Sequence, residues 1–163
     1  MGQVLQLRQS PHESRPASSV FEDSPFRATD VYVVFTSIDE TLAAAQVASG
    51  LAKALTTRLT LIHFQAVPYP LATDAPIDRS PAEMEAFVKA LRAMGVDVRV
   101  RVYLCRDPRR AIPSAFTHRS LIVIGGHRSW WPTRAERWRR TLEAAGHLVV
   151  FVDKSQYKEP SHA

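Results

Sequence analysis

Hydrophobic and polar positions along this chain fall into blocks that predict five strands separated by four helices. Short, mostly apolar runs mark four of the strands, at residues 31–36, 58–65, 121–124 and 148–152. Residues 96–104 instead alternate strictly between aliphatic and polar or aromatic positions. Near-continuous apolar runs are typical of parallel strands covered on both faces, whereas alternation indicates one wet face. We therefore expect an α/β fold with a doubly wound, five-stranded parallel sheet in which 96–104 is an edge or partly uncovered strand.

Helix-start and helix-stop signals stand between the strands. Three pairs have the spacing of a capping box, namely Ser37 with Glu40, Ser80 with Glu83, and Thr133 with Glu136. Asp107 precedes Pro108 as a fourth N-cap, and Pro113 is expected to shorten or kink that helix. The apolar side of the first helix is predicted to consist of Leu42, Ala45, Val47, Ala48, Leu51, Ala52 and Leu55.

The regular pattern covers residues 29–154, which we interpret as one domain. Residues 1–28 are rich in serine, proline and charge without periodicity, so we expect a disordered N-terminal arm, and we expect a flexible tail at 155–163. No apolar run reaches the roughly 18 residues of a membrane helix, and no secretory signal is visible. The chain has a single cysteine, Cys105, which we interpret as structural and which cannot form an internal disulfide. These features together predict a cytoplasmic protein.

The order and spacing of these features resemble the universal stress protein family over Asp30 to Asp153. The matching segments are Leu59–His63, Gly95–Val98, Asp107-Pro108 with Ala111-Ile112, and Leu121–Gly125. The resemblance implies an adenine nucleotide alpha hydrolase-like fold with sheet order 3-2-1-4-5, which would place the alternating third strand at an edge. It also implies a regulatory or interaction module in the stress response.

Ligands of doubly wound sheets bind beyond the carboxyl ends of the strands, at the switch point between the first and fourth strands of this order. The candidate ligand- or anion-binding residues there are Thr36, Ser37, Arg106, Gly125, Gly126, His127, Arg128 and Thr133. ATP-binding members of the family carry aspartate, glycine and glycine where this chain has Thr36, Arg106 and Arg128. A Cβ atom obstructs the close approach of a phosphate, so we expect little or no ATP binding. A remodelled pocket for a nucleotide or another anion, held by arginines and helix amides, stays open as the alternative.

Other chemistry is less well supported by the residues. No Ser/His/Asp set, paired carboxylates or metal-ligand spacing is visible, so we expect neither an enzyme nor a metal site. The net charge of +5 permits anionic partners, but it alone does not make nucleic acid the expected one. Trp130 and Trp131 could stack on a base, or they could cover the sheet or fill the vacated pocket; we favour the second interpretation and expect one of them to be partly buried.

The last strand raises the question of assembly. Its residues, Leu148, Val149, Val150, Phe151 and Val152, contain no lysine, proline or polar alternation to protect an edge. We therefore expect a homodimer that pairs two copies along this edge, and the family resemblance implies the same. The alternative is that the N-terminal arm or the C-terminal tail folds over the edge.

Overall fold

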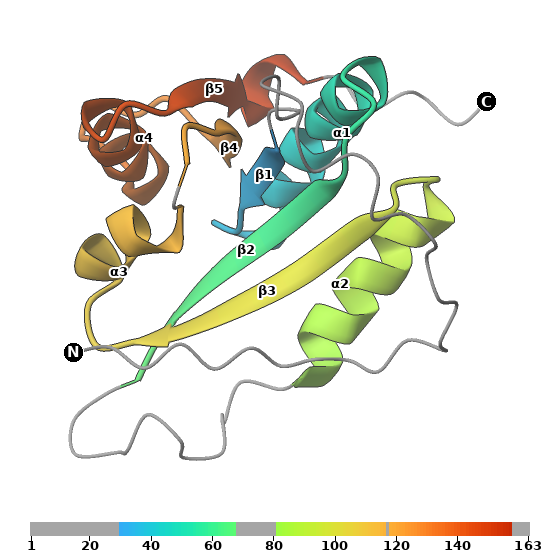
Figure 1. The fold of residues 1–163 in the computed structure, drawn as a ribbon, viewed down its shortest axis with the longest axis horizontal. Coiled ribbons are helices and arrows are strands. Elements are labelled where there is room, and N and C mark those ends of the chain that lie inside the picture. The colour runs from blue at the N-terminus through green and yellow to red at the C-terminus, as the bar shows by residue number, and fades with distance from the viewer. Residues whose placement is uncertain (1–29, 68–80, 117, 158–163) are drawn as a thin grey trace, which may run out of the picture.

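The sheet has the predicted topology. The computed structural model describes residues 30–67, 81–116 and 118–157 (Figure 1). Its strands are β1 (Val31–Val34), β2 (Leu59–Ala66), β3 (Val98–Cys105), β4 (Leu121–Gly126) and β5 (Leu148–Asp153). They form one parallel sheet in the order β3-β2-β1-β4-β5, so β3 and β5 are its edges. The expected N-terminal arm at 1–28 lies outside the described residues.

Helices cover both faces of this sheet. They are α1 (Ile38–Ala54), α2 (Pro81–Ala93), α3 (Pro108–Ala115) and α4 (Arg134–Ala144), followed by a short 3-10 helix, η1 (Lys154–Gln156). One core cluster joins α1 and α2 to the sheet, and a second joins α3 and α4 to its other face (Figure 1). The N-caps predicted at Ser37, Asp107 and Thr133 are confirmed, since each side chain accepts a backbone N–H of the following turn. Ser80 lies outside the described residues.

Helix α1 packs through small residues rather than through the predicted large ones. Its buried side consists of Thr41, Ala43, Ala44, Ala45, Ala48, Ser49 and Ala52. Leu42, Val47 and Leu51 are only half-buried, and the prediction that Leu55 faces inward was wrong, because this side chain is 45% exposed. Alanine side chains allow the axis of the helix to approach the sheet closely, which matters for the site described below.

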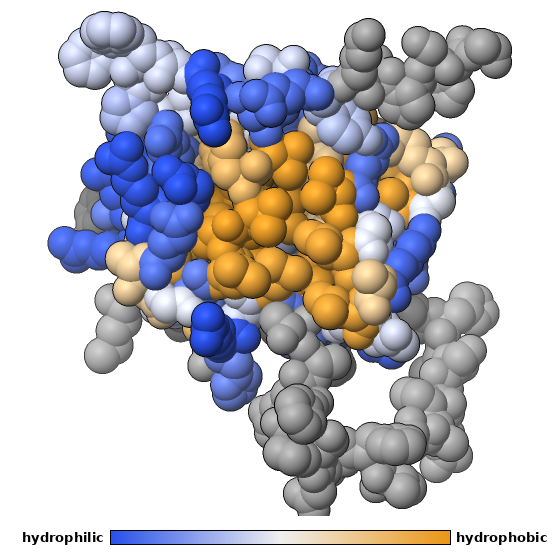
Figure 2. All heavy atoms as spheres, turned by 90° about the horizontal axis from the view of Figure 1, so that it is seen from above, coloured by the Kyte–Doolittle hydropathy of each residue, from blue (hydrophilic) through white to orange (hydrophobic). Residues whose placement is uncertain are grey.

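The β5 edge is apolar and accessible. Leu148 is 57% exposed, while Val149, Val150 and Phe151 are half-buried. Figure 2 shows a contiguous hydrophobic patch where β5 and the adjoining side of α1 meet the surface. No helix in the described part of the chain is long and apolar enough to cross a membrane.

Candidate functional site

The switch point between the carboxyl ends of β1 and β4, where doubly wound sheets form a crevice, is bridged here by the protein's own hydrogen bonds. The Thr36 hydroxyl donates to the carbonyl oxygen of Gly125 at 2.9 Å, which links the two strand ends directly. The Thr36 amide donates to the hydroxyl of the fully buried Thr41 at 3.1 Å. Thr36 was predicted as a ligand residue, but here its hydroxyl and its amide both have partners within the fold.

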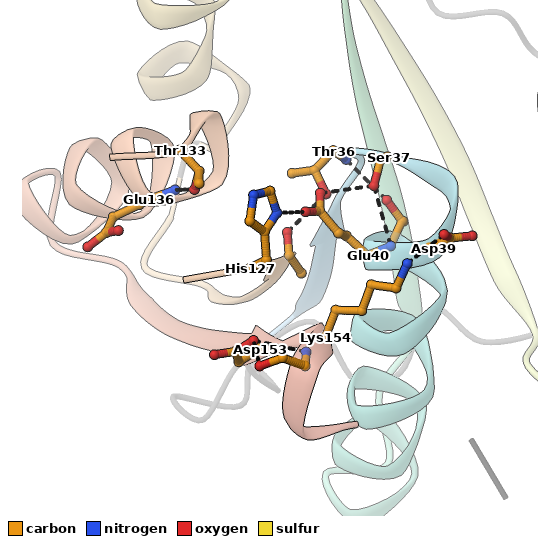
Figure 3. Close-up of polar contacts among 12 residues, drawn as sticks. Thr36, Ser37, Asp39, Glu40, His127, Thr133, Glu136, Asp153 and Lys154 are labelled. Atoms are coloured by element: carbon orange, nitrogen blue, oxygen red, sulfur yellow. Dashed lines mark hydrogen bonds and ion pairs between the residues drawn. The ribbon is translucent and has the colours of Figure 1, made fainter. Parts of the chain in front are cut away.

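Glu40, in the first turn of α1, spans the same crevice. One carboxylate oxygen lies 2.7 Å from His127 Nδ1 in the loop after β4, and the other accepts the Ser37 hydroxyl at 2.9 Å (Figure 3). The Glu40 side chain is only 14% exposed, whereas His127 is 58% exposed. The sequence analysis had assigned Glu40 only to the capping box. Its position three residues after Ser37, directly above the switch point, was the available signal for this second contact.

Two further carboxylates lie around this crevice. Asp153 Oδ1 accepts the amide of Ser155 at 3.0 Å and its hydroxyl at 2.7 Å, and these bonds, helped by the charge of Arg128, lower the pKa of Asp153. Arg128 Nε lies 3.7 Å from Asp153 Oδ2. The Lys154 ammonium lies 2.6 Å from Asp39 in the first turn of α1 (Figure 3). Of the two arginines that the sequence analysis had considered for an anion, Arg128 therefore lies close to a carboxylate of the protein itself.

The two glycines at the end of β4 serve packing. A Cβ on Gly125 would overlap the carbonyl group of Glu40 and would come within 3.2 Å of the Glu40 Cα. A Cβ on Gly126 would lie 2.7 Å from the Phe151 ring and 2.8 Å from the Cβ of Ala135. Gly125 therefore allows α1 to lie against β4. On the other face, Gly126 leaves room for Ala135 of α4 and for the Phe151 ring. Neither glycine requires a ligand to explain it.

Two predicted site residues have local roles. Arg106 Nη1 donates to the carbonyl oxygen of Val67 at 3.1 Å, which ties the loop after β3 to the end of β2. The Thr133 hydroxyl accepts the Glu136 amide at 3.3 Å and caps α4. The structure thus brings Thr36, Ser37, Gly125 and His127 together around Glu40, with Arg128 beside Asp153.

The expectation that Trp130 or Trp131 is partly buried, where it would cover the sheet or fill the vacated pocket, was wrong. Trp130 is 93% exposed and Trp131 is 76% exposed. The core of this face is instead filled by Trp138 of α4. Its ring packs edge-on against Phe64, with the ring centres 5.9 Å apart, and the Arg134 guanidinium carbon lies 4.4 Å from the centre of the Trp138 ring. With that face already packed and the crevice bridged by Glu40, the loop tryptophans lie in solvent.

The polar groups do not form a nucleophilic triad. Ser37 and His127 both contact the carboxylate of Glu40, so the carboxylate lies between them and the serine hydroxyl donates to it. A triad requires the imidazole in the middle position, where it accepts the serine proton. Cys105 is buried, and desolvation raises the pKa of its thiol, which is opposite to the activation of a nucleophile. Within the described ranges, no group of three metal-ligating side chains occurs.

A hollow of about 410 Å³ lies at the opposite end of the molecule. Its lining comes from the end of α1, the start of β2 and the turn before β3, and includes Lys53, Arg58, Asp97 and Arg99. These charged side chains are all exposed. The hollow is therefore separate from the strand ends where the sequence placed the site.

Comparison with known proteins identifies the fold. No protein-family model and no curated protein matches the sequence. Among solved structures, a universal stress protein from Archaeoglobus fulgidus superposes with a TM-score of 0.58 at 16% identity, covering 77% of this chain and 98% of that chain. A universal stress protein in complex with cAMP gives a TM-score of 0.50 at 18% identity, covering 78% and 99%. The chain has the universal stress protein fold. This fold accounts for the strand order, and the bridged crevice lies at its switch point.

Proposed function

We propose that this chain is a regulatory or interaction module of the universal stress protein kind, which forms a homodimer and binds ATP weakly or not at all. The lone, buried Cys105 supports a reducing compartment, so the cytoplasm is part of the proposal. The module would act through its surfaces rather than through catalysis.

The contact between Glu40 and His127 carries the proposal on ATP. A phosphate entering between β1 and β4 would meet the Glu40 carboxylate, which is 14% exposed and already bonded on both oxygens. It would also have to part Thr36 from Gly125. Repulsion between like charges and the loss of internal hydrogen bonds both oppose binding.

Thermal unfolding in the presence of ATP tests this. A dissociation constant of about 1 μM at about 1 mM ATP would stabilise the domain by about 4 kcal/mol and raise Tm by roughly 10 °C. We expect no resolvable rise. In Glu40→Gln the negative charge is gone while an acceptor for Ser37 remains, so this variant should gain measurable affinity for ATP. A large Tm rise in the wild type would contradict the proposal.

A second candidate function is binding of a nucleotide or another anion in a remodelled pocket. It is supported by the fold neighbour that holds cAMP and by the exposed His127 and Arg128 beside the crevice. Calorimetry with cAMP, ATP and inorganic phosphate separates the two candidates. Saturable binding that His127→Ala abolishes, with no gain on Glu40→Gln, would favour the second.

The β5 edge supports the dimer. An unprotected apolar edge strand offers a row of backbone donors and acceptors to a second copy. Here the edge lies within the hydrophobic patch of Figure 2, where β5 adjoins α1. Pairing of two β5 strands about a two-fold axis would cover the same patch on both copies.

Light scattering tests the dimer. We expect the wild type at about twice the chain mass of 18.3 kDa, and Val150→Lys as a monomer. Val100→Lys is the matched control, because Val100 is also half-buried, belongs to the same core face and lies on the opposite edge strand, β3. This control should remain a dimer. A monomeric wild type would instead favour an edge covered by the chain's own terminal segments.

A further inference from the structure

The loop between β4 and α4 presents two adjacent indole rings to solvent. Trp130 and Trp131 are the most exposed of the large hydrophobic side chains in the described part of the chain, at 93% and 76%. Every residue from 127 to 132 is exposed, including Pro132. Rings of this size are normally buried or used, because their apolar surface is unfavourable in water. The loop therefore has the properties of a contact surface.

Positive charge flanks these rings in the sequence. Residues 127–140 contain five arginines and one glutamate, a net charge of +4 in a chain whose total is +5. Arg139 and Arg140 pair with Glu136 on α4, and Arg139 also contacts Glu143. Arg128 and Arg137, which lie before and after the tryptophans in the chain, are exposed. The Arg128 side chain is 82% accessible, although its Nε lies 3.7 Å from Asp153 Oδ2.

We propose that the loop 127–132, with the first turns of α4, docks on the surface of a membrane containing anionic phospholipids. Tryptophan rings settle at the headgroup level of a bilayer, where the apolar ring and the N–H are both accommodated. Arginines beside them attract anionic headgroups. The proposed attachment is peripheral, since only a loop tip inserts and the sheet and helices stay outside the hydrocarbon.

The shape of the loop favours a membrane over single-stranded nucleic acid. Proteins that stack bases usually combine an aromatic platform with a charged groove that follows the backbone of the strand. A ring that is 93% exposed has almost no protein surface beside it, so Trp130 cannot form the wall of a groove. An exposed pair of tryptophans with arginines on either side of it in the chain matches a flat, negatively charged surface better.

The two apolar surfaces of the molecule are distinct. The β5 patch is contiguous, and its residues pack against the two core clusters, which suits a second copy of the chain. The tryptophan loop follows the carboxyl end of β4 and belongs to neither core cluster. Arg128 of the loop lies 3.7 Å from Asp153 at the end of β5, so the loop and the edge residues 148–152 are neighbouring but different surfaces. A dimer would present two such loops.

Sedimentation of the full chain with vesicles tests the proposal. We expect binding to phosphatidylcholine vesicles that contain phosphatidylglycerol and much weaker binding to phosphatidylcholine alone. Binding should shift the tryptophan emission to shorter wavelength. It should weaken when ionic strength rises from about 0.1 M to about 1 M, because the Debye length falls from about 10 Å to about 3 Å.

Four variants assign the surface. Trp130→Ala with Trp131→Ala should lower the partition coefficient by at least about tenfold and abolish the emission shift. Arg128→Gln with Arg137→Gln should lower it by roughly fivefold per arginine. The matched controls lie at the opposite end, where Leu55 is 45% exposed and Arg58 and Arg99 are exposed. Leu55→Ala, and Arg58→Gln with Arg99→Gln, should bind nearly as the wild type does.

Three results would overturn the proposal. The first is an absence of binding to the anionic vesicles, and the second is binding that the double tryptophan variant retains. The third is a loss of binding in the Arg58 and Arg99 control that equals the loss in the Arg128 and Arg137 variant. Binding would then depend on the overall charge of the protein and not on this loop. A single-stranded oligonucleotide is tested in parallel. If it quenched the tryptophan fluorescence without shifting the emission wavelength, and the vesicles did not bind, the ligand of this loop would be nucleic acid and not a membrane.

Discussion

Gly125→Ala is the sharpest test of how the switch point is built. The added Cβ would overlap the backbone carbonyl of Glu40, which belongs to the first turn of α1 and cannot rotate away as a side chain could. Helix α1 would have to move off β4. That movement would strain the hydrogen bond from Thr36 to the Gly125 carbonyl and the contact of Glu40 with His127.

The expected cost follows from these contacts. Overpacking of a closely packed position costs about 1–3 kcal/mol, and loss of one internal hydrogen bond adds about 1 kcal/mol. We therefore expect Gly125→Ala to lower the free energy of unfolding by about 3 kcal/mol and Tm by roughly 10 °C. Gly126→Ala should cost less, because its overlap with the Phe151 ring and the Ala135 Cβ is smaller than the overlap with the Glu40 backbone, and the end of the ring can shift.

Urea unfolding followed by circular dichroism provides the measurement. Gly50→Ala is the control, since no atom lies within 4 Å of its added Cβ and the position is inside α1. It should stabilise the protein by about 0.5–1 kcal/mol. If Gly125→Ala changed stability by less than about 0.5 kcal/mol, the packing argument would fail and the glycine would have to be explained by a ligand.

Two further predictions concern titratable groups. Burial lowers the pKa of His147 below 6.5, and its Nδ1 accepts the Ser120 amide at 3.3 Å. The unfolded chain therefore binds the proton more readily than the folded chain. The stability that this histidine contributes is fully present above pH 6.5 and should fall as the pH drops towards the lower pKa of the folded state. In unfolding measurements across this pH range, His147→Asn should remove the dependence. The Cys105 thiol, buried and with a raised pKa, should react with an aromatic disulfide reagent far more slowly in the native protein than in urea; equal rates would contradict its burial.

The fold could be predicted because its signals are local and repeated. Capping residues at Ser37, Asp107 and Thr133 begin three helices, and the alternation before Cys105 correctly indicated an edge strand. The inward face of α1 was predicted only in part, since Ala45, Ala48 and Ala52 are buried as expected whereas Leu55 is exposed. Periodicity assigns large apolar residues to the core. How closely a helix packs on a sheet depends instead on the smallest residues at the contact, and this distance is a property of the tertiary structure.

The candidate site could be located from the sequence but not understood from it. Thr36, Ser37, Gly125 and His127 were expected at the same strand ends, and the structure places them there. What the sequence could not show is that Glu40 joins Ser37 to His127, because this contact links residues 87 positions apart. Nor could it show that Asp153 would face Arg128, since β4 and β5 bring them together only through the sheet register.

The glycine pattern has a physical explanation in this arrangement. Gly125 remains because α1 needs the space beside it, which would hold whether or not a nucleotide were present. Arg128 has no such constraint, since its side chain is 82% exposed and pairs only loosely with Asp153. A glycine needed for the fold is thus kept, while the position that would serve only a phosphate carries a long charged side chain. This difference is what is expected when the fold is retained and the crevice is bridged by Glu40, and it agrees with our proposal that the tryptophan loop and the β5 edge are the contact surfaces.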